Sequence, residues 1–236
     1  GSAEFEQHYC IDTSLVGPAA ATPGAVFVRI NGEGPAGTDP AQGFVGQLAL
    51  RHHAVVSSLE HRFYGKSVPY PTAHALRDQL QYLTVEQALA DVHDFITTVI
   101  NVKWPGVPVL VTGGSYSGAL SAWYRQTYPD SCVASYSSSG VVNTILDFTA
   151  FDEEVAAAAG QECADVLRAT TAAMEADVPA AKAAFDVPAL PDNDFWYMVA
   201  DSAAMAVQYG HKEDLCKAME AASSDGPSRV RALSTF

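Results

Sequence analysis

The first 145 residues alternate short apolar runs with helical patterns, and this alternation constrains the fold more than any other feature. Apolar runs that predict buried strands lie at residues 25–30, 53–59, 108–112 and 132–137. Thr84 begins a capping box, and apolar residues follow it at helical spacing to about Asn101. Strands that alternate with helices are typical of βα units around a mostly parallel sheet, so we predict an α/β fold.

The pattern changes after about residue 146, where alanine-rich helical segments replace the strand-like runs. We therefore expect two parts, a sheet-containing part at residues 5–146 and a helical part at residues 147–236.

Charge and cysteine spacing exclude several classes of function. Thirteen Lys and Arg against 27 Asp and Glu give a net charge of −14, which would repel a phosphate backbone or an anionic membrane. No apolar stretch is long enough to span a bilayer. The four cysteines, at positions 10, 132, 163 and 216, lack metal-ligand spacing. They allow two disulfides in any of three pairings, and we predict neither a metal nor another cofactor.

A strand, a glycine pair, a serine and a helix follow one another from residue 108 onward, as in the nucleophile elbow of serine hydrolases. Ser115 would sit at the tip of the turn, with the small residues Gly113 and Ser117 two positions away on either side. Ser117 stands where the strict pattern has glycine, and it is a rival nucleophile, but the strand ends too early to place it at the tip. The alternative is an ordinary turn rich in glycine and serine.

An acyl-transfer site also needs donors for the oxyanion. The N–H of Tyr116, next to the serine, would supply one donor. The loop at residues 31–34, which includes Gly32 and Gly34, follows an earlier strand and would supply another, although such a loop is often only a tight turn.

Three ordered blocks, EHRFYGKS at 60–67, YLTVEQALAD at 82–91 and GGSYSG at 113–118, resemble the family of lysosomal Pro-X carboxypeptidase and dipeptidyl peptidase II. The segment from Ala200 to Cys216 looks closest to its thymus-specific serine protease branch. The resemblance covers the N-terminal part of such a protein. It implies an α/β-hydrolase core, interrupted after the elbow by a helical cap that is incomplete here.

The resemblance also implies that Ser115 is the nucleophile of a serine peptidase that forms an acyl-enzyme and cleaves peptides next to proline. Such enzymes work in lysosomal, vacuolar or secreted settings. Glu33 falls where dipeptidyl peptidases carry an acid for the free amine of the substrate. The pairing of the family's cap implies a disulfide between Cys163 and Cys216, which leaves Cys10 and Cys132 to pair.

Polar residues at the end of the second predicted strand, Glu60, His61 and Arg62, are interpreted as a buried network that supports the site. The fold's chain order is serine, acid, histidine. His211 is the only histidine beyond Ser115, and a compact triad would take its acid from Asp192, Asp194 or Asp201.

The family instead places the acid and the histidine beyond Phe236. We therefore expect the chain to need a second chain or a missing C-terminal part. A compact esterase or lipase that uses His211, and a non-catalytic structural or binding fragment, are the alternatives.

Overall fold

The computed structural model describes residues 4–17, 22–69, 77–222 and 224–236. The chain forms two compact units, Gly1–Thr144 and Ile145–Phe236. The first contains a sheet and the second is helical, so each is described by itself.

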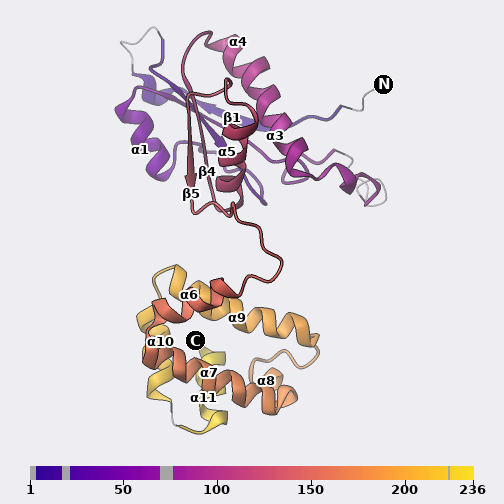
Figure 1. The fold of residues 1–236 in the computed structure, drawn as a ribbon, viewed down its shortest axis with the longest axis vertical. Helices are drawn as coiled ribbons and strands as arrows, with labels where there is room; N and C mark the ends of the chain where they lie inside the picture. The colour runs from indigo at the N-terminus through magenta and orange to yellow at the C-terminus, as the bar shows by residue number, and fades with distance from the viewer. Residues whose placement is uncertain (1–3, 18–21, 70–76, 223) are drawn as a thin grey trace. The chain divides into compact units, whose positions relative to one another are not determined.

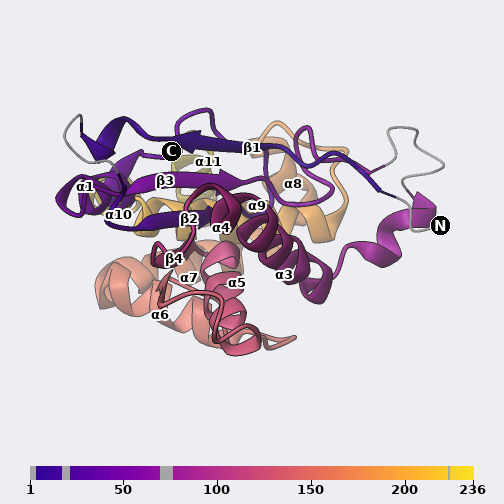
Figure 2. The same cartoon turned by 90° about the horizontal axis from the view of Figure 1, so that it is seen from above.

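A five-stranded, mostly parallel sheet forms the centre of the first unit, as predicted. Its strands follow the spatial order β1-β3-β2-β4-β5. The strand β1 is antiparallel to β3, and the other neighbours are parallel. Figure 2 shows β1, β3, β2 and β4 side by side in that order. The bounds of the strands are β1 Tyr9–Asp12, β2 Val26–Ile30, β3 Val55–Leu59, β4 Val109–Gly114 and β5 Ala134–Ser138.

Helices cover both faces of this sheet (Figure 1). On one face lie α3 (Val85–Asp94), the π-helical turn η3 (Phe95–Ile100), α4 (Asn101–Lys103) and α5 (Tyr116–Thr127). The other face carries α1 (Gly43–Arg51). The unit also contains the short 3-10 turns η1 (Ser14–Val16) and η2 (Leu80–Tyr82). Thr84 caps α3 as predicted, because its hydroxyl accepts a hydrogen bond from the N–H of Gln87 at 3.3 Å.

The alternation of side chains along β2 places the main core on the α3–α5 face. Val26, Val28 and Ile30 point to that face and are buried with Leu120 and Ile96. Burial of apolar side chains of this size contributes about 1.5–3 kcal/mol each, so this layer fixes the sheet against the helices.

The second unit contains six helices among its described residues, with a core of its own around Met174, Phe195, Leu215 and Met219. A disulfide joins Cys163 to Cys216, with Cα atoms 5.2 Å apart, as the family resemblance implied. No helix in the described ranges is both long and apolar enough to cross a membrane. The helices are α6 Thr149–Ala159, α7 Gln161–Ala176, α8 Val178–Ala184, α9 Asp192–Gln208, α10 Lys212–Ala221 and α11 Gly226–Thr235.

The predicted bridge between Cys10 and Cys132 is wrong, because both cysteines are free. Cys10 lies on β1, and Cys132 lies two residues before β5. These two strands form opposite edges of the sheet, with β3, β2 and β4 between them. Neighbouring strands are about 4.8 Å apart, whereas the Cα atoms of a disulfide must approach to less than about 7 Å.

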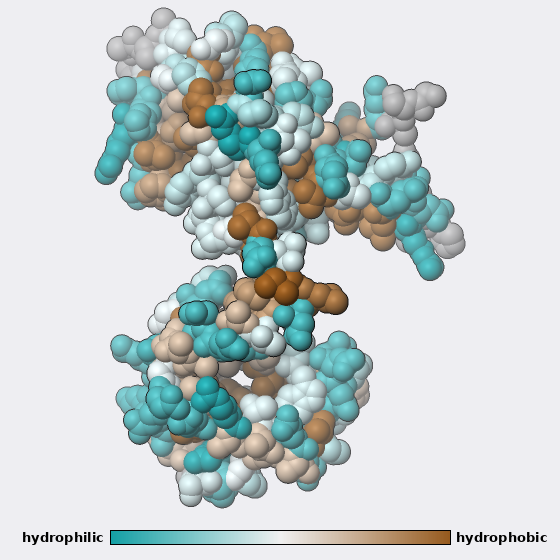
Figure 3. Space-filling model, viewed as in Figure 1, coloured by the Kyte–Doolittle hydropathy of each residue, from teal (hydrophilic) through white to brown (hydrophobic). Residues whose placement is uncertain are grey.

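Large apolar side chains remain exposed on both units (Figure 3). Several belong to the segment that follows β5, where Val142, Ile145 and Phe148 are each about half exposed and Leu146 is fully exposed. Exposed large apolar residues of this kind are candidates for contact with other polypeptide.

Candidate active site

Ser115 lies at a tight turn between β4 and α5, with backbone angles φ 57° and ψ −125°. A positive φ is costly for a residue with a side chain and persists only where the surrounding structure holds it. The N–H of Ser115 donates to the carbonyl of Ser138 on β5 at 3.0 Å. This is the strand–turn–helix geometry of a nucleophile elbow, and it leaves Ser115 exposed.

Close packing around the turn explains why glycine is needed at positions 113 and 118. A Cβ atom on Gly113 would lie 1.9 Å from the carbonyl oxygen of Ser117, so any side chain there would displace the helix. A Cβ atom on Gly118 would lie 2.8 Å from the carbonyl oxygen of Ser138 and 3.0 Å from the Cα of Gly140. The first turn of α5 therefore rests directly on the end of β5.

Ser117, the rival nucleophile, is buried and engaged with the backbone of the elbow. Its hydroxyl donates to the carbonyl of Gly114 at 2.8 Å and accepts from the N–H of the same residue at 3.1 Å. By contrast, the Ser115 hydroxyl has no hydrogen-bond partner among the described residues. Of the two serines, only Ser115 is exposed and has a hydroxyl without a hydrogen bond to a described residue.

The loop after β2 lies against the elbow. A Cβ atom on Gly32 would be 3.7 Å from the Tyr116 ring and 3.8 Å from the N of Ser117. Asn31 ties the loop to the end of β3, since its side-chain amide donates to the carbonyl of Leu59 at 2.8 Å. Gly34 has open space where a side chain would be, and Glu33 is exposed. The structure thus brings Gly32 to the elbow.

The carboxylate of Glu60 is almost fully buried behind this loop, at 1% exposure. It accepts hydrogen bonds from the N–H groups of Ala36 and Lys66, each at 2.9 Å, and from the Ser67 hydroxyl at 2.6 Å. Burial has the largest single effect and raises the pKa of Glu60, but the three hydrogen bonds and the nearby His8 together outweigh it, so that the pKa is lowered. A Cβ on Gly65 would lie 1.9 Å from this carboxylate, and its φ of +54° also requires glycine.

His61 connects this buried segment to the elbow. Its Nδ1 lies 2.7 Å from the carbonyl oxygen of Arg62, and its Nε2 lies 3.1 Å from the hydroxyl of Tyr116. Desolvation by burial is the main cause that lowers the pKa of His61. Burial likewise raises the pKa of the Tyr116 hydroxyl, and the nearby Tyr64 and Glu33 raise it further.

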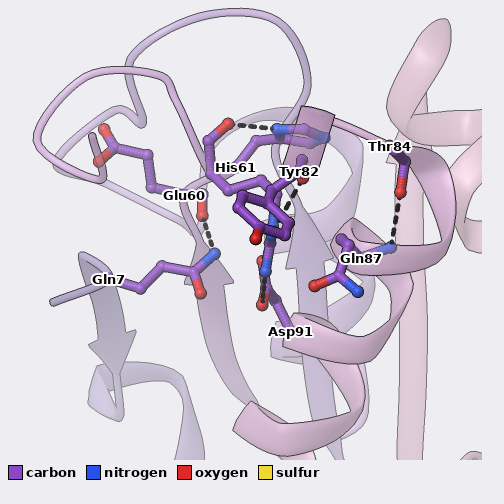
Figure 4. A network of polar contacts seen from close by, with 8 residues as sticks. Gln7, Glu60, His61, Tyr82, Thr84, Gln87 and Asp91 are labelled. Carbon is purple, nitrogen blue, oxygen red and sulfur yellow. Dashed lines mark hydrogen bonds and ion pairs between the residues drawn. The ribbon is translucent and has the colours of Figure 1, made fainter. Parts of the chain in front are cut away.

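Arg62 forms a two-pronged ion pair with Asp91 of α3, in which Nε and Nη2 each lie 2.6 Å from a carboxylate oxygen. A third bond runs from Nη1 to the carbonyl of Tyr82 at 3.0 Å. Figure 4 shows Asp91 and Tyr82 beside this segment, with the Gln7 side chain pointing to the main-chain carbonyl of Glu60. Asp91 and Ser67 belong to the network but were given no role from the sequence, although they end two of the quoted blocks.

His211 lies in the second unit, at the residue before α10. It is exposed, and its Nδ1 is 3.7 Å from a carboxylate oxygen of Asp214 in the first turn of the helix. Of the three acids considered for a compact triad, Asp192 forms an ion pair with Lys182. Within the first unit, no described histidine or carboxylate forms a hydrogen bond with the Ser115 hydroxyl.

An α/β sheet with an exposed serine at a strained strand-to-helix turn is the architecture of α/β-hydrolase enzymes. The family model of serine carboxypeptidase S28 matches residues 2–232. The chain therefore belongs to the S28 family of serine peptidases, and the resemblance seen in its sequence blocks is confirmed.

Relatives of known name agree with this assignment. The chain is 37% identical over 227 residues to "Probable serine protease EDA2" of Arabidopsis thaliana, covering 90% of this chain and 46% of that protein. It is 37% identical over 136 residues to the human "Thymus-specific serine protease", covering 56% and 26% of the two chains. The human "Lysosomal Pro-X carboxypeptidase" is 37% identical over 105 residues, a match that covers 42% of this chain and 21% of that protein. The chain thus spans less than half the length of these relatives.

Proposed function

We propose that this chain carries the nucleophile of a serine peptidase that cleaves peptide bonds next to proline through an acyl-enzyme on Ser115. The observation that supports this most directly is the strained elbow, which presents an exposed hydroxyl with no competing hydrogen bond. The preference for proline follows from the family and from the printed name of the Pro-X carboxypeptidase relative.

The oxyanion of the tetrahedral intermediate would be held by main-chain N–H groups at the elbow. The N–H of Tyr116 is one candidate donor, because Tyr116 starts α5 and the first N–H groups of a helix have no partner within it. The Gly32–Gly34 loop is the second, and the contact between Gly32 and the Tyr116 ring supports this role. Glu33, exposed on the same loop, would then bind the free amine of a peptide substrate.

The acid and the general-base histidine would come from outside this chain, from a C-terminal part or a second chain. Without a base the serine hydroxyl is a weak nucleophile, and loss of a triad member typically costs several orders of magnitude in rate. We therefore infer that the 236-residue chain alone has little peptidase activity. The lysosomal and extracellular names of relatives support a location in the secretory pathway.

A fluorophosphonate probe tests this proposal. The purified chain and a longer product of the same gene would be treated at acidic and neutral pH, each beside its Ser115→Ala variant. We expect rapid labelling of the longer product at Ser115 and very slow labelling of the chain alone. A proline-containing peptide should be cleaved by the labelled form and not by its Ser115→Ala variant. If Ser115 is labelled in neither form, the proposal is wrong.

One further variant distinguishes the compact triad that uses His211 from this proposal. Rapid labelling of the chain alone that disappears in His211→Ala would establish a triad that uses His211. A short-chain chromogenic ester would then be the better substrate. If the chain has no activity and only binds the rest of the protein, it is the non-catalytic structural or binding fragment that was the other alternative.

A further inference from the structure

The face of the sheet that carries α1 also carries a row of polar side chains. In the register of the strands, Arg29 of β2 pairs with Ser58 of β3 on one side and with Thr112 of β4 on the other. Strand neighbours in register point to the same face, which is the face of Phe27 and Val56 because side chains alternate along each strand. The three side chains therefore lie next to one another across the middle of the sheet.

None of these three side chains has a polar partner within the described parts of the chain. The hydroxyls of Ser58 and Thr112 are buried, each residue at 2% exposure, and neither makes a hydrogen bond. The guanidinium of Arg29, which is partly buried, forms no hydrogen bond or ion pair. Such groups are costly to leave unpaired, and most buried polar groups in folded proteins have a partner.

We propose that Arg29, at the centre of this row, pairs with a carboxylate side chain from a segment of the same protein that lies outside this chain and packs on the α1 face of the sheet. The inference rests on the proposal that the chain is one part of a longer peptidase. The guanidinium of Arg29 is the donor that a carboxylate can reach from outside, and it can give the carboxylate two parallel hydrogen bonds, while the buried hydroxyls of Ser58 and Thr112 flank it in the row.

Several observations favour a segment of the same protein as the occupant. The apolar cluster of α1 is built on Phe27 and Val56, one row away from Arg29 along the strands. Tyr136 of β5, in register with Thr112, is 41% exposed, so the end of this row is open. The chain covers only 46% of its Arabidopsis relative, so relatives have ample further chain to cover this face. A second copy is disfavoured because each chain carries a net charge of −14.

Phenylglyoxal, which modifies accessible guanidinium groups, tests this inference when its sites are mapped by mass spectrometry. Arg29 should react in the 236-residue chain and at least about tenfold more slowly in the longer gene product, because a charged hydrogen bond must first open. Arg51, exposed at the end of α1, should react in both forms. Arg62, paired with Asp91, should be protected in both.

Variants give a second measurement. Arg29→Gln should leave the melting temperature of the 236-residue chain unchanged and lower that of the longer product, whereas Arg51→Gln should alter neither. Equal reactivity of Arg29 in both forms, or a gene that encodes nothing further, would overturn the inference. Protection of Arg29 without labelling of Ser115 would refute the proposed function and leave this inference standing. Labelling of Ser115 without protection of Arg29 would refute this inference and leave the proposed function standing.

Discussion

The hydroxyl of Tyr116 lies 3.1 Å from Nε2 of His61, a residue 55 positions earlier in the chain, and the two are hydrogen-bonded. The other ring nitrogen of His61 faces a carbonyl oxygen and must therefore carry the proton. Because burial lowers the pKa of His61, the ring is neutral near pH 7, and Nε2 then presents its lone pair to the Tyr116 hydroxyl. Through this bond the buried end of β3 fixes the side chain of the residue that follows the elbow serine.

Replacing Tyr116 with Phe should lower the pKa of His61 further. The hydroxyl can rotate to accept a charge-assisted hydrogen bond from the protonated ring, so its loss removes a partner of the charged form and adds to the desolvation that already lowers the pKa below the ordinary value of 6.5. Titration of the imidazole signals by NMR would measure the change. Tyr64→Phe is the matched control, since the Tyr64 ring contacts His61 edge-on but its hydroxyl makes no bond to it. An unchanged or higher pKa of His61 in Tyr116→Phe would contradict this prediction.

Replacing Glu60 with Gln should destabilise the first unit by about 1–3 kcal/mol at pH 7, because an amide N–H would face buried donors. The folded pKa of Glu60 is lowered, so its stabilising effect is present above the ordinary value of 4.5 and is lost as the pH falls through the folded pKa. The difference in the free energy of unfolding between wild type and variant should therefore become smaller at acidic pH. Urea unfolding followed by circular dichroism at several pH values measures it. Glu33→Gln, at an exposed site, serves as control, and equal stability at pH 7 would refute the prediction.

Replacing Ser117 with Ala should loosen the elbow. The N–H and the carbonyl of Gly114 would each lose a partner, and the expected loss of stability is about 1 kcal/mol because water can reach this exposed residue. Amide hydrogen exchange at Gly114 should accelerate. Ser121→Ala is the control on the same helix, since its hydroxyl bonds to the carbonyls of Gly118 and Tyr136 instead. Unaltered exchange at Gly114 would show that the serine clamp is unimportant.

Removing the disulfide with Cys163→Ser and Cys216→Ser should lower the stability of the second unit. The two cysteines are 53 residues apart, and closing a loop of this length contributes about 4 kcal/mol in the chain-entropy model. Thermal unfolding of the double variant, beside Cys10→Ser, measures this loss. Alkylation of the native protein should label Cys10 before Cys132, because burial raises the pKa of the Cys132 thiol. Four reactive thiols in the untreated protein would contradict the bridge.

Local patterns were enough to predict the parallel strands, the capped helix α3 and the elbow, because each depends on residues that are adjacent in the sequence. The strand β1 was not predicted, since four residues at a sheet edge have too little periodicity to detect. The helix α1 was missed because glycines at positions 43 and 46 weaken its helical signal.

The arrangement of these elements in space required the structure. The error in pairing Cys10 with Cys132 arose because the order of strands in a sheet is not contained in cysteine spacing. The roles of Ser117 and Asp91 likewise depend on tertiary contacts. In the sequence Ser117 appears only as a departure from the glycine of the motif.

The bond from Ser115 to Ser138 has a consequence for biosynthesis. The serine, its strand and its helix all leave the ribosome before β5 does, yet the backbone of Ser115 is held by a carbonyl on β5, and α5 rests on Gly140. Until those later residues emerge, the costly conformation at Ser115 has no support, and the turn will relax. The nascent chain therefore gains its presented hydroxyl only after the fifth strand has docked, which delays a reactive group until the sheet around it is complete.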